Sequence, residues 1–336
     1  MNSLVTRHSL LIAAVALAAA CAGAAGFRTA PVADYKEGNW SFGASAGTAF
    51  VGGEAHEHVF SPKANSHEYA TEVGLPDDGK RHQLSRLDWD IAATMIGFSG
   101  SARNGRLSLN LGVWYGCSGT DDLDMNDYDW MDGDFTDHSH RSLSEVELTD
   151  AWMFDASLSY DFWRGDAFTG YAFAGLREQR WKWMQDGFSE YWYPLDEGGH
   201  CTDDGHGIDY RQVVIFGYVG LGGTWSLSDT LEFSAYASWA PRYKGRDRDN
   251  HISADKYFTE HFDYDDGEVY AAGIELAWRV TDPLKLTLCV DWQKATLHEG
   301  TINSWDLDTD ETERTVDGAG YENEYVAFSI GASYTF

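Results

Sequence analysis

The sequence has few basic residues, few prolines and almost no long apolar runs. Only 24 of its 336 residues are Lys or Arg, against 54 Asp and Glu, so the formal net charge is -30. A charge of this sign argues against a nucleic-acid-binding protein. The mean hydropathy of -0.41 argues against a bundle of transmembrane helices. With 43% hydrophobic and 15% aromatic residues, the chain is still too apolar for a disordered acidic polymer.

One long apolar run is present, from Leu10 to Ala25, behind Arg7 and ending in small residues. This layout is typical of a secretory signal peptide. We therefore expect a signal peptide over residues 1–24 and a mature chain over residues 25–336.

Cysteine is scarce as well, with four residues in the whole chain. Cys21 lies in the apolar run and could be read as the lipidated cysteine of a lipoprotein, although only alanines precede it. Cleavage of the signal peptide would leave Cys117, Cys201 and Cys289, an odd number that cannot form a complete disulfide framework.

The mature chain lacks sustained helical periodicity and instead alternates apolar and polar residues. Segments 107–115, 231–239, 270–280 and 284–292 each place aliphatic or aromatic side chains on one face and polar side chains on the other. Soluble β-sandwiches and membrane β-barrels both produce this pattern.

Three further features favour the barrel. The alternating segments run to about 12–17 residues, longer than soluble strands of roughly 5–6 and suited to a tilted membrane crossing. Short turns alternate with connections of roughly 20–30 residues, as in bacterial outer-membrane barrels. The chain also ends in an alternating strand that closes on Phe336, an ending that resembles that of outer-membrane barrels.

We therefore predict an all-β fold, a ten-stranded antiparallel transmembrane β-barrel with long extracellular loops. The expected strands are 39–50, 84–98, 105–117, 143–163, 167–184, 208–226, 229–242, 266–281, 284–297 and 322–336. An even number places both termini in the periplasm and the long loops, near 51–83, 118–142, 185–207, 243–265 and 298–321, outside the cell. Ten strands leave too little room for a wide aqueous pore if side chains fill the lumen.

The densest cluster of ionisable residues is the expected loop 118–142, which contains eight aspartates. A calcium site was considered, but the spacing of Asp127, Asp129 and Asp132 before Gly133 has one residue too many for an EF-hand. Adventitious binding of divalent cations and a merely solvated acidic loop stay open, and we predict no metal site.

A serine hydrolase was also considered, because residues 43–47 read Gly-Ala-Ser-Ala-Gly. A nucleophile elbow requires a strand, a sharp turn and a helix. These residues lie within the first expected strand instead, so this reading is set aside.

Several segments, taken in order, resemble the omptins, a family of ten-stranded outer-membrane endopeptidases of Gram-negative bacteria. The segments are Gln83-Leu84-Ser85-Arg86-Leu87-Asp88-Trp89, Asp127-Tyr128-Asp129-Trp130-Met131-Asp132, Thr136-Asp137-His138-Ser139, Glu178-Gln179-Arg180, Tyr218-Val219-Gly220-Leu221, Asp249-Asn250-His251 and Gly318-Ala319-Gly320. No single segment is unique, but their order and spacing along the mature chain are specific.

The resemblance implies an aspartic-type endopeptidase whose catalytic groups are a carboxylate pair, Asp127 and Asp129, and a dyad, Asp249 and His251. Both groups fall in expected extracellular loops, which can face each other across the barrel mouth. Asp249 and His251 stand two residues apart, so on an extended strand end both side chains point to the same side. The family's active-site serine coincides with Ser139, which we interpret as a supporting hydroxyl.

The implied mechanism is direct attack of water on a peptide carbonyl, without an acyl-enzyme. His251 would act as general base, Asp249 would orient its ring, and the carboxylate pair would position the water and take part in proton exchange. Acidic neighbours should raise the pKa of His251, so activity should fall on mild acidification.

Omptins prefer a basic residue before the scissile bond, often within a dibasic pair. The resemblance places the acidic groups that hold this residue at Glu57 and Asp247. Two carboxylates suit a guanidinium, which can bind bidentately, and the net charge would attract cationic peptides or proteins.

Family members also bind lipopolysaccharide, which supports activity, through external basic and polar side chains. Glu178 and Arg180 match part of that cluster. Leu176 stands where an aromatic is expected and Val213 where an arginine is expected, and these departures argue against dependence on lipopolysaccharide. We expect no other cofactor.

The expected protein is a monomer in the bacterial outer membrane, in contact with its lipids, with the active site on the extracellular side. The competing hypothesis is a non-enzymatic barrel that serves as an adhesin or a narrow channel. Loss of one of the four catalytic positions would have favoured it, and all four are present.

Overall fold

The computed structural model describes residues 38–61, 81–119, 123–130, 138–192, 200–205, 207–252, 255–263 and 267–336. These residues form fourteen strands in one antiparallel sheet. No helix within these ranges has the length and apolarity needed to cross a membrane. The predicted signal peptide, residues 1–24, lies outside the described residues, as do residues 131–137 of the acidic segment.

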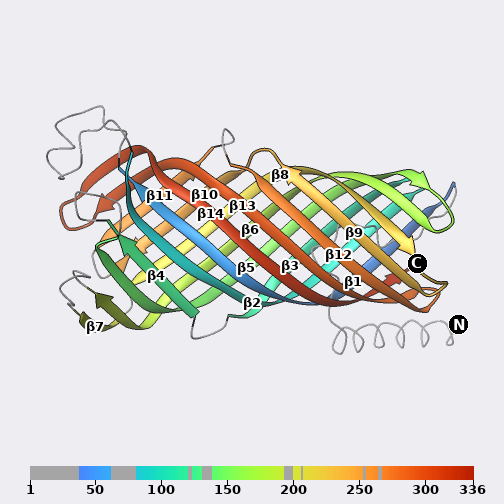
Figure 1. Ribbon diagram of the computed structural model, residues 1–336, viewed down its shortest axis with the longest axis horizontal. Coiled ribbons are helices and arrows are strands. Elements are labelled where there is room, and N and C mark those ends of the chain that lie inside the picture. Colours follow the sequence, from blue (N-terminus) through green and yellow to red (C-terminus); the bar gives the residue numbers. More distant parts are fainter. Residues whose placement is uncertain are drawn as a thin grey trace, which may run out of the picture.

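Ten of the strands close into a ring, which confirms the predicted barrel (Figure 1). They are β1 (Trp40–Phe60), β2 (Gln83–Asn104), β3 (Leu107–Gly119), β5 (His140–Arg164), β6 (Phe168–Trp192), β8 (Ile208–Ser226), β9 (Leu231–Ala240), β12 (Val269–Thr281), β13 (Leu284–Asp306) and β14 (Glu311–Thr335). Each pairs with the next along the chain, and β14 pairs with β1 from Gly43↔Thr335 to Val59↔Ala319.

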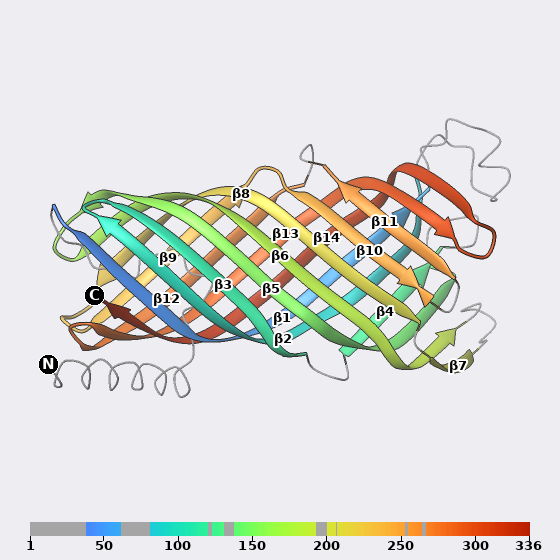
Figure 2. The same ribbon diagram turned by 180° about the vertical axis from the view of Figure 1, so that it is seen from behind.

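Four further strands lengthen the wall at one end of the barrel, where the prediction had placed loops. They are β4 (Leu123–Asp129), β7 (His200–Gly205), β10 (Lys244–His251) and β11 (Lys256–Phe262). β4 lies between β2 and β5, β10 pairs with β8, β11 pairs with β13, and β7 pairs with β6. The C-terminus lies at the opposite end (Figures 1 and 2).

The described parts of the expected long loops are therefore largely strand. β1 continues to Phe60, β13 to Asp306, and β14 already begins at Glu311. Extending the ladder pairs backbone N–H and C=O groups that a loop would have to satisfy in other ways. Above the apolar part of the wall, both faces of a strand can carry polar residues. The alternation of apolar and polar residues that predicts a strand is therefore lost there.

An apolar belt surrounds the end of the barrel with the short turns. On β3 the outward Leu107, Leu109 and Leu111 are 46–48% exposed, whereas the intervening Ser108 and Asn110 are buried in the lumen. Exposed apolar side chains continue around the ring on β5, β9, β12 and β14. Apolar side chains facing outward and polar ones facing inward are the arrangement of a membrane barrel.

Polar side chains fill the lumen inside this belt. Arg177 Nε donates to Asp155 Oδ2 at 2.9 Å, and Gln179 Nε2 donates to Gln293 Oε1 at 2.9 Å across the barrel. Tyr218 donates its hydroxyl proton to Asp155 as well. These contacts join β5, β6, β8 and β13, and they occupy the space that a channel would need.

A stack of buried aromatic rings connects opposite walls nearer the mouth. Trp89 of β2 lies 4.8 Å from Tyr210 of β8, centroid to centroid, and Trp183 of β6 lies 5.7 Å from Tyr210. All three side chains are fully buried. The stack fixes the distance between the strands that carry the groups described next.

Candidate active site

The candidate catalytic residues lie on two added strands, β4 and β10, on different sides of the barrel mouth. Asp127 and Asp129 occupy β4, and Asp249 and His251 occupy β10. The prediction placed both pairs in loops, but β4 is held by β2 and β5, and β10 by β8 and β11. Side chains two apart on a strand share a face, so each pair points in one direction.

Asp249 and His251 contact each other, as their spacing predicts. The Nε2–H of His251 donates to Asp249 Oδ2 at 2.5 Å, and Asp249 is 3% exposed. The ring edge of Phe258 packs at 5.1 Å between centroids. This arrangement fixes the imidazole ring and leaves Nδ1 as the nitrogen that can accept a proton.

Opposing influences set the pKa of His251. Burial alone lowers it, but the charge of Asp249, the hydrogen bond to Asp249 and the charge of Asp127 outweigh burial, so the pKa is raised above its usual value of 6.5. A neighbouring carboxylate favours the imidazolium in this way.

Asp127 and Asp129 form an electrostatically strained pair. Burial, and then the charge of Asp129, raise the pKa of Asp127 to about 7, although Ser85 Oγ donates to Asp127 Oδ1 at 3.1 Å. Burial also raises the pKa of Asp129, against the influence of His140. Near neutral pH the pair can therefore hold a proton or release it.

The two pairs face the same space. The charge of His251 lowers the pKa of Asp127 and of Asp129, and the charge of Asp127 raises the pKa of His251. Trp89, which is opposite Met125 of β4, stacks 4.8 Å from Tyr210, which is opposite Asp249 of β10, so the two strands approach each other across the mouth. The structure thus brings together the four residues that the sequence singled out.

Ser139 lies between β4 and β5 and contacts the end of β4. Its side chain is 6% exposed, its Oγ donates to the backbone carbonyl of Asp129 at 3.3 Å, and it lies 2.9 Å from His140 Nδ1. The Ser139 backbone N–H also donates to the Asp129 carbonyl, at 2.8 Å. These contacts hold the end of β4. Ser85, which approaches the carboxylate pair from β2, was not singled out by the sequence analysis as a site residue.

A buried acidic pocket adjoins the dyad. Glu57 on β1 and Asp247 on β10 are each 1% exposed, and Tyr210 donates its hydroxyl proton to Asp247 Oδ2 at 2.8 Å. Burial raises the pKa of Asp247 to about 8, partly offset by that hydrogen bond, and Asp249 raises it further. Burial, and then the charges of Asp249 and other carboxylates, hold the pKa of Glu57 well above its usual range.

The pocket contains a third carboxylate that the sequence analysis missed, Glu260 on β11. Asp247 and Glu260 are directly opposite each other in the β10–β11 pairing. Burial, and then Asp247 and Asp249, hold the pKa of Glu260 well above its usual range. Reading residues 244–262 as a hairpin that turns after His251 would have predicted this pairing.

Glu178 and Arg180 are on β6 and face outward, away from the site. Arg180 forms an ion pair with Asp150, and Val213 is opposite Arg180 on β8. Arg246 on β10 is opposite Val213 in turn. The arginine that the family has at Val213 is absent, but arginines flank the position.

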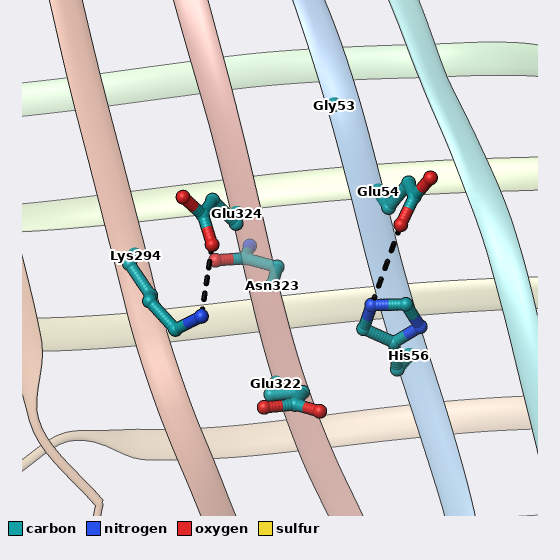
Figure 3. A pocket seen from close by; sticks show the side chains of 7 residues that line it. All are labelled: Gly53, Glu54, His56, Lys294, Glu322, Asn323 and Glu324. Atoms are coloured by element: carbon teal, nitrogen blue, oxygen red, sulfur yellow. Dashed lines mark hydrogen bonds and ion pairs between the residues drawn. The ribbon is translucent and has the colours of Figure 1, made fainter.

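Another concavity, of about 450 Å³, lies on the outer wall (Figure 3). Its lining residues are Gly53, Glu54, His56, Lys294, Glu322, Asn323 and Glu324. His56 Nε2 is 3.7 Å from Glu54 Oε2, and Lys294 Nζ is 2.8 Å from Glu324 Oε2. His56 also contacts Asp88, and Glu322 contacts His58, so its charged groups have protein partners, and none of the candidate catalytic residues lines it.

Within the described residues, no group of three or more His, Cys, Asp or Glu side chains is arranged to hold a metal ion. Cys117 on β3 is exposed and Cys289 on β13 is buried, and neither forms a disulfide within the described residues.

Comparisons with known proteins agree with the fold. The model of the omptin family matches residues 37–336. Protease 7 of Escherichia coli (strain K12) is 26% identical over 275 residues, which cover 79% of this chain and 85% of that protein. The outer membrane protease OmpP of the same strain is 27% identical over 276 residues, with 78% and 84% covered. The crystal structure of the outer membrane protease OmpT from E. coli has a TM-score of 0.77 at 21% identity and covers 88% of this chain and 97% of that one.

Proposed function

The chain belongs to the omptin family of outer-membrane proteins, and we propose that it is an aspartic-type endopeptidase that cleaves peptide bonds after basic residues. One observation carries the proposal: a carboxylate pair on β4 and an Asp-His pair on β10 act on each other across the barrel mouth. The active site would face the extracellular side, and the protein would act as a monomer.

In the proposed reaction, water attacks the peptide carbonyl directly. His251 takes a proton from the water through Nδ1, while Asp249 keeps the ring oriented and stabilises the imidazolium. Asp127 and Asp129 hold the water between the two walls. As the tetrahedral intermediate collapses, the leaving amine takes up a proton, and a carboxyl with a pKa of about 7 suits that transfer.

The contacts of Ser139 support its assignment as a supporting hydroxyl and not a nucleophile. An attacking serine needs a base within hydrogen-bond reach. The Ser139 hydroxyl donates its proton to the carbonyl of Asp129, so it does not present that proton to the adjacent ring of His140.

Glu57 and Asp247 would hold the basic side chain before the scissile bond. Both are buried, and a substrate without a cation would leave their carboxyl groups without a partner, which disfavours its binding. A dibasic substrate would gain further from the net charge of -30 through long-range attraction.

A non-enzymatic adhesin or narrow channel is the alternative. The hydrogen-bonded side chains that fill the lumen, such as Arg177 with Asp155 and Gln179 with Gln293, speak against a channel. Binding by an adhesin does not require an Asp249–His251 pair that faces the carboxylates of Asp127 and Asp129.

Anionic outer-membrane lipid, including lipopolysaccharide, is the proposed partner of the outer wall. Arg211 on β8 is opposite Arg248 on β10. Burial lowers the pKa of Arg211, and the charges of Arg180, Arg248 and Arg246 lower it further, which shows that these guanidinium groups crowd one another. Crowded arginines in an acidic protein suit lipid phosphates, which accept bidentate hydrogen bonds.

The proposed activity can be tested on the full chain refolded in detergent, with and without lipopolysaccharide. A quenched peptide with an Arg-Arg pair should be cleaved, and the same peptide with Ala-Ala should not. His251→Ala should reduce kcat by about 10²- to 10⁴-fold, whereas His261→Ala, an exposed histidine on β11, should not. Equal turnover by native protein and His251→Ala would remove His251 from the mechanism, and no turnover by either would favour the adhesin.

A further inference from the structure

Glu260 is a buried acid without any partner in the described part of the chain. It is 0% exposed, and neither Oε1 nor Oε2 has a hydrogen-bond partner. Its neighbours across the strands are Asp247 on β10 and the apolar Ile302 on β13. A buried carboxyl is ordinarily paired or hydrogen-bonded because desolvation is costly.

The surroundings of Glu260 make its burial still less favourable. Two carboxyl groups directly opposite each other on neighbouring strands repel each other once both are ionised, and Asp247 is directly opposite Glu260. Three neighbouring carboxyl groups each have one oxygen without a hydrogen-bond partner as well. These oxygens are Glu57 Oε2, Asp247 Oδ1 and Asp249 Oδ1. These unpaired oxygens belong to carboxyl groups that act on one another electrostatically, and a cationic side chain would satisfy them.

We propose that Glu260 is a further specificity-determining residue, the third carboxylate of the pocket that receives the basic side chain of the substrate. The inference rests on the proposed function and deepens it. Glu57 and Asp247 can engage four of the five guanidinium N–H donors bidentately, and Glu260 supplies an acceptor for the fifth. An ammonium has only three donors, so the third carboxylate favours arginine over lysine.

The test compares native protein with Glu260→Gln on three peptides that differ only in the residue before the scissile bond: Arg, Lys or Leu. For the Arg peptide, kcat/KM should fall about 10- to 100-fold, because the amide of Gln keeps an acceptor oxygen but loses the negative charge that strengthens the contact with the guanidinium. The loss should come mainly from KM. The Lys peptide should lose less, so that the Arg/Lys preference narrows, and the Leu peptide should not lose at all. Glu313→Gln, an exposed glutamate on β14, is the matched control.

A second measurement separates specificity from folding. Glu260→Gln keeps the shape of the side chain and removes a buried like charge, so the unfolding midpoint of the variant should equal or exceed that of native protein. A lower midpoint together with equal losses on all three peptides would assign Glu260 a structural role and overturn the proposal.

Failure of this inference is distinguishable from failure of the proposed function. If native protein and Glu260→Gln cleave the Arg peptide equally, the inference is wrong and the endopeptidase stands. If native protein cleaves nothing, binding of agmatine, a free guanidinium compound, still tests the pocket. Agmatine should raise the unfolding midpoint of native protein more than that of Glu260→Gln, and equal shifts would overturn the proposal.

Discussion

His251 combines burial, which favours the neutral ring, with a short contact to Asp249, which favours the charged ring. A general base must be neutral to accept a proton, and the raised pKa places the loss of activity at a higher pH than for an ordinary histidine. The acid limb of kcat/KM against pH should therefore have its midpoint above 6.5.

Asp249→Asn provides the check on this assignment. Without the carboxylate charge, burial dominates, and the acid limb of the variant should move to lower pH while kcat falls. The profile is measured with the Arg-Arg peptide between about pH 5 and 9, a range that brackets the ordinary and the raised pKa of a histidine. A rate that is constant from neutral pH down to about 5 would contradict a histidine base.

The raised pKa of Asp247 makes the stability of the folded protein depend on pH. Its pKa is about 8 in the folded protein against 3.8 for an ordinary aspartate, so between these pH values the folded state holds a proton that the unfolded state has lost. Stability should then fall as pH rises through this window.

Asp247→Asn should remove that dependence. The gain in denaturation midpoint over native protein should be larger at pH 9 than at pH 5, because only at the higher pH does native protein bear the buried charge. Denaturant titration of the refolded barrel at the two pH values measures this difference in midpoint. A variant that is destabilised equally at pH 5 and pH 9 would disprove this account of Asp247.

The sequence predicts the role of some site residues but not of others. The contact of Asp249 with His251 follows from a spacing of two on a strand, and the residue types came from the resemblance. Glu260 could not be found in that way, because its role depends on the pairing of β10 with β11, whereas the sequence predicts a loop over residues 243–265.

At the scale of elements, the strands of the apolar belt were predictable and those of the mouth were not. β3, β8, β9 and β12 follow the alternation of apolar and polar residues closely, because lipid faces one side of each and the lumen the other. β4, β7, β10 and β11 have polar residues on both faces, so hydrophobicity carries no strand signal there. Their backbone pairing turns the expected loops into a rigid wall for the site.

The outer face of β6, β8 and β10 offers a test of the lipid proposal. Arg246 and Arg248 are exposed on β10, and the guanidinium of Arg248 lies over the ring of Tyr257. Arg246→Gln combined with Arg248→Gln should weaken binding of lipopolysaccharide, seen as a smaller rise in unfolding midpoint when lipopolysaccharide is added. Arg314→Gln, exposed on β14, is the control. An unchanged rise in the double variant would leave these arginines without a lipid role.

At the scale of the whole molecule, closure of the ring positions two walls that lie far apart in the sequence. β14 pairs with β1, and the stack of Trp89, Trp183 and Tyr210 spans the lumen between β2 and β8. β2 supports β4, and β8 supports β10. The carboxylate pair and the Asp-His pair are thereby held on a common rigid frame, as preorganised catalysis requires.

The central claim is that these two walls act on one water molecule, and a double-mutant cycle tests it most directly. kcat/KM for the Arg-Arg peptide is measured for native protein, Asp127→Asn, His251→Ala and the double variant. Groups that act as a unit are strongly non-additive, so the double variant should lose little more than the more damaging single variant. Losses that multiply in full would show that Asp127 and His251 act independently, and would contradict the account.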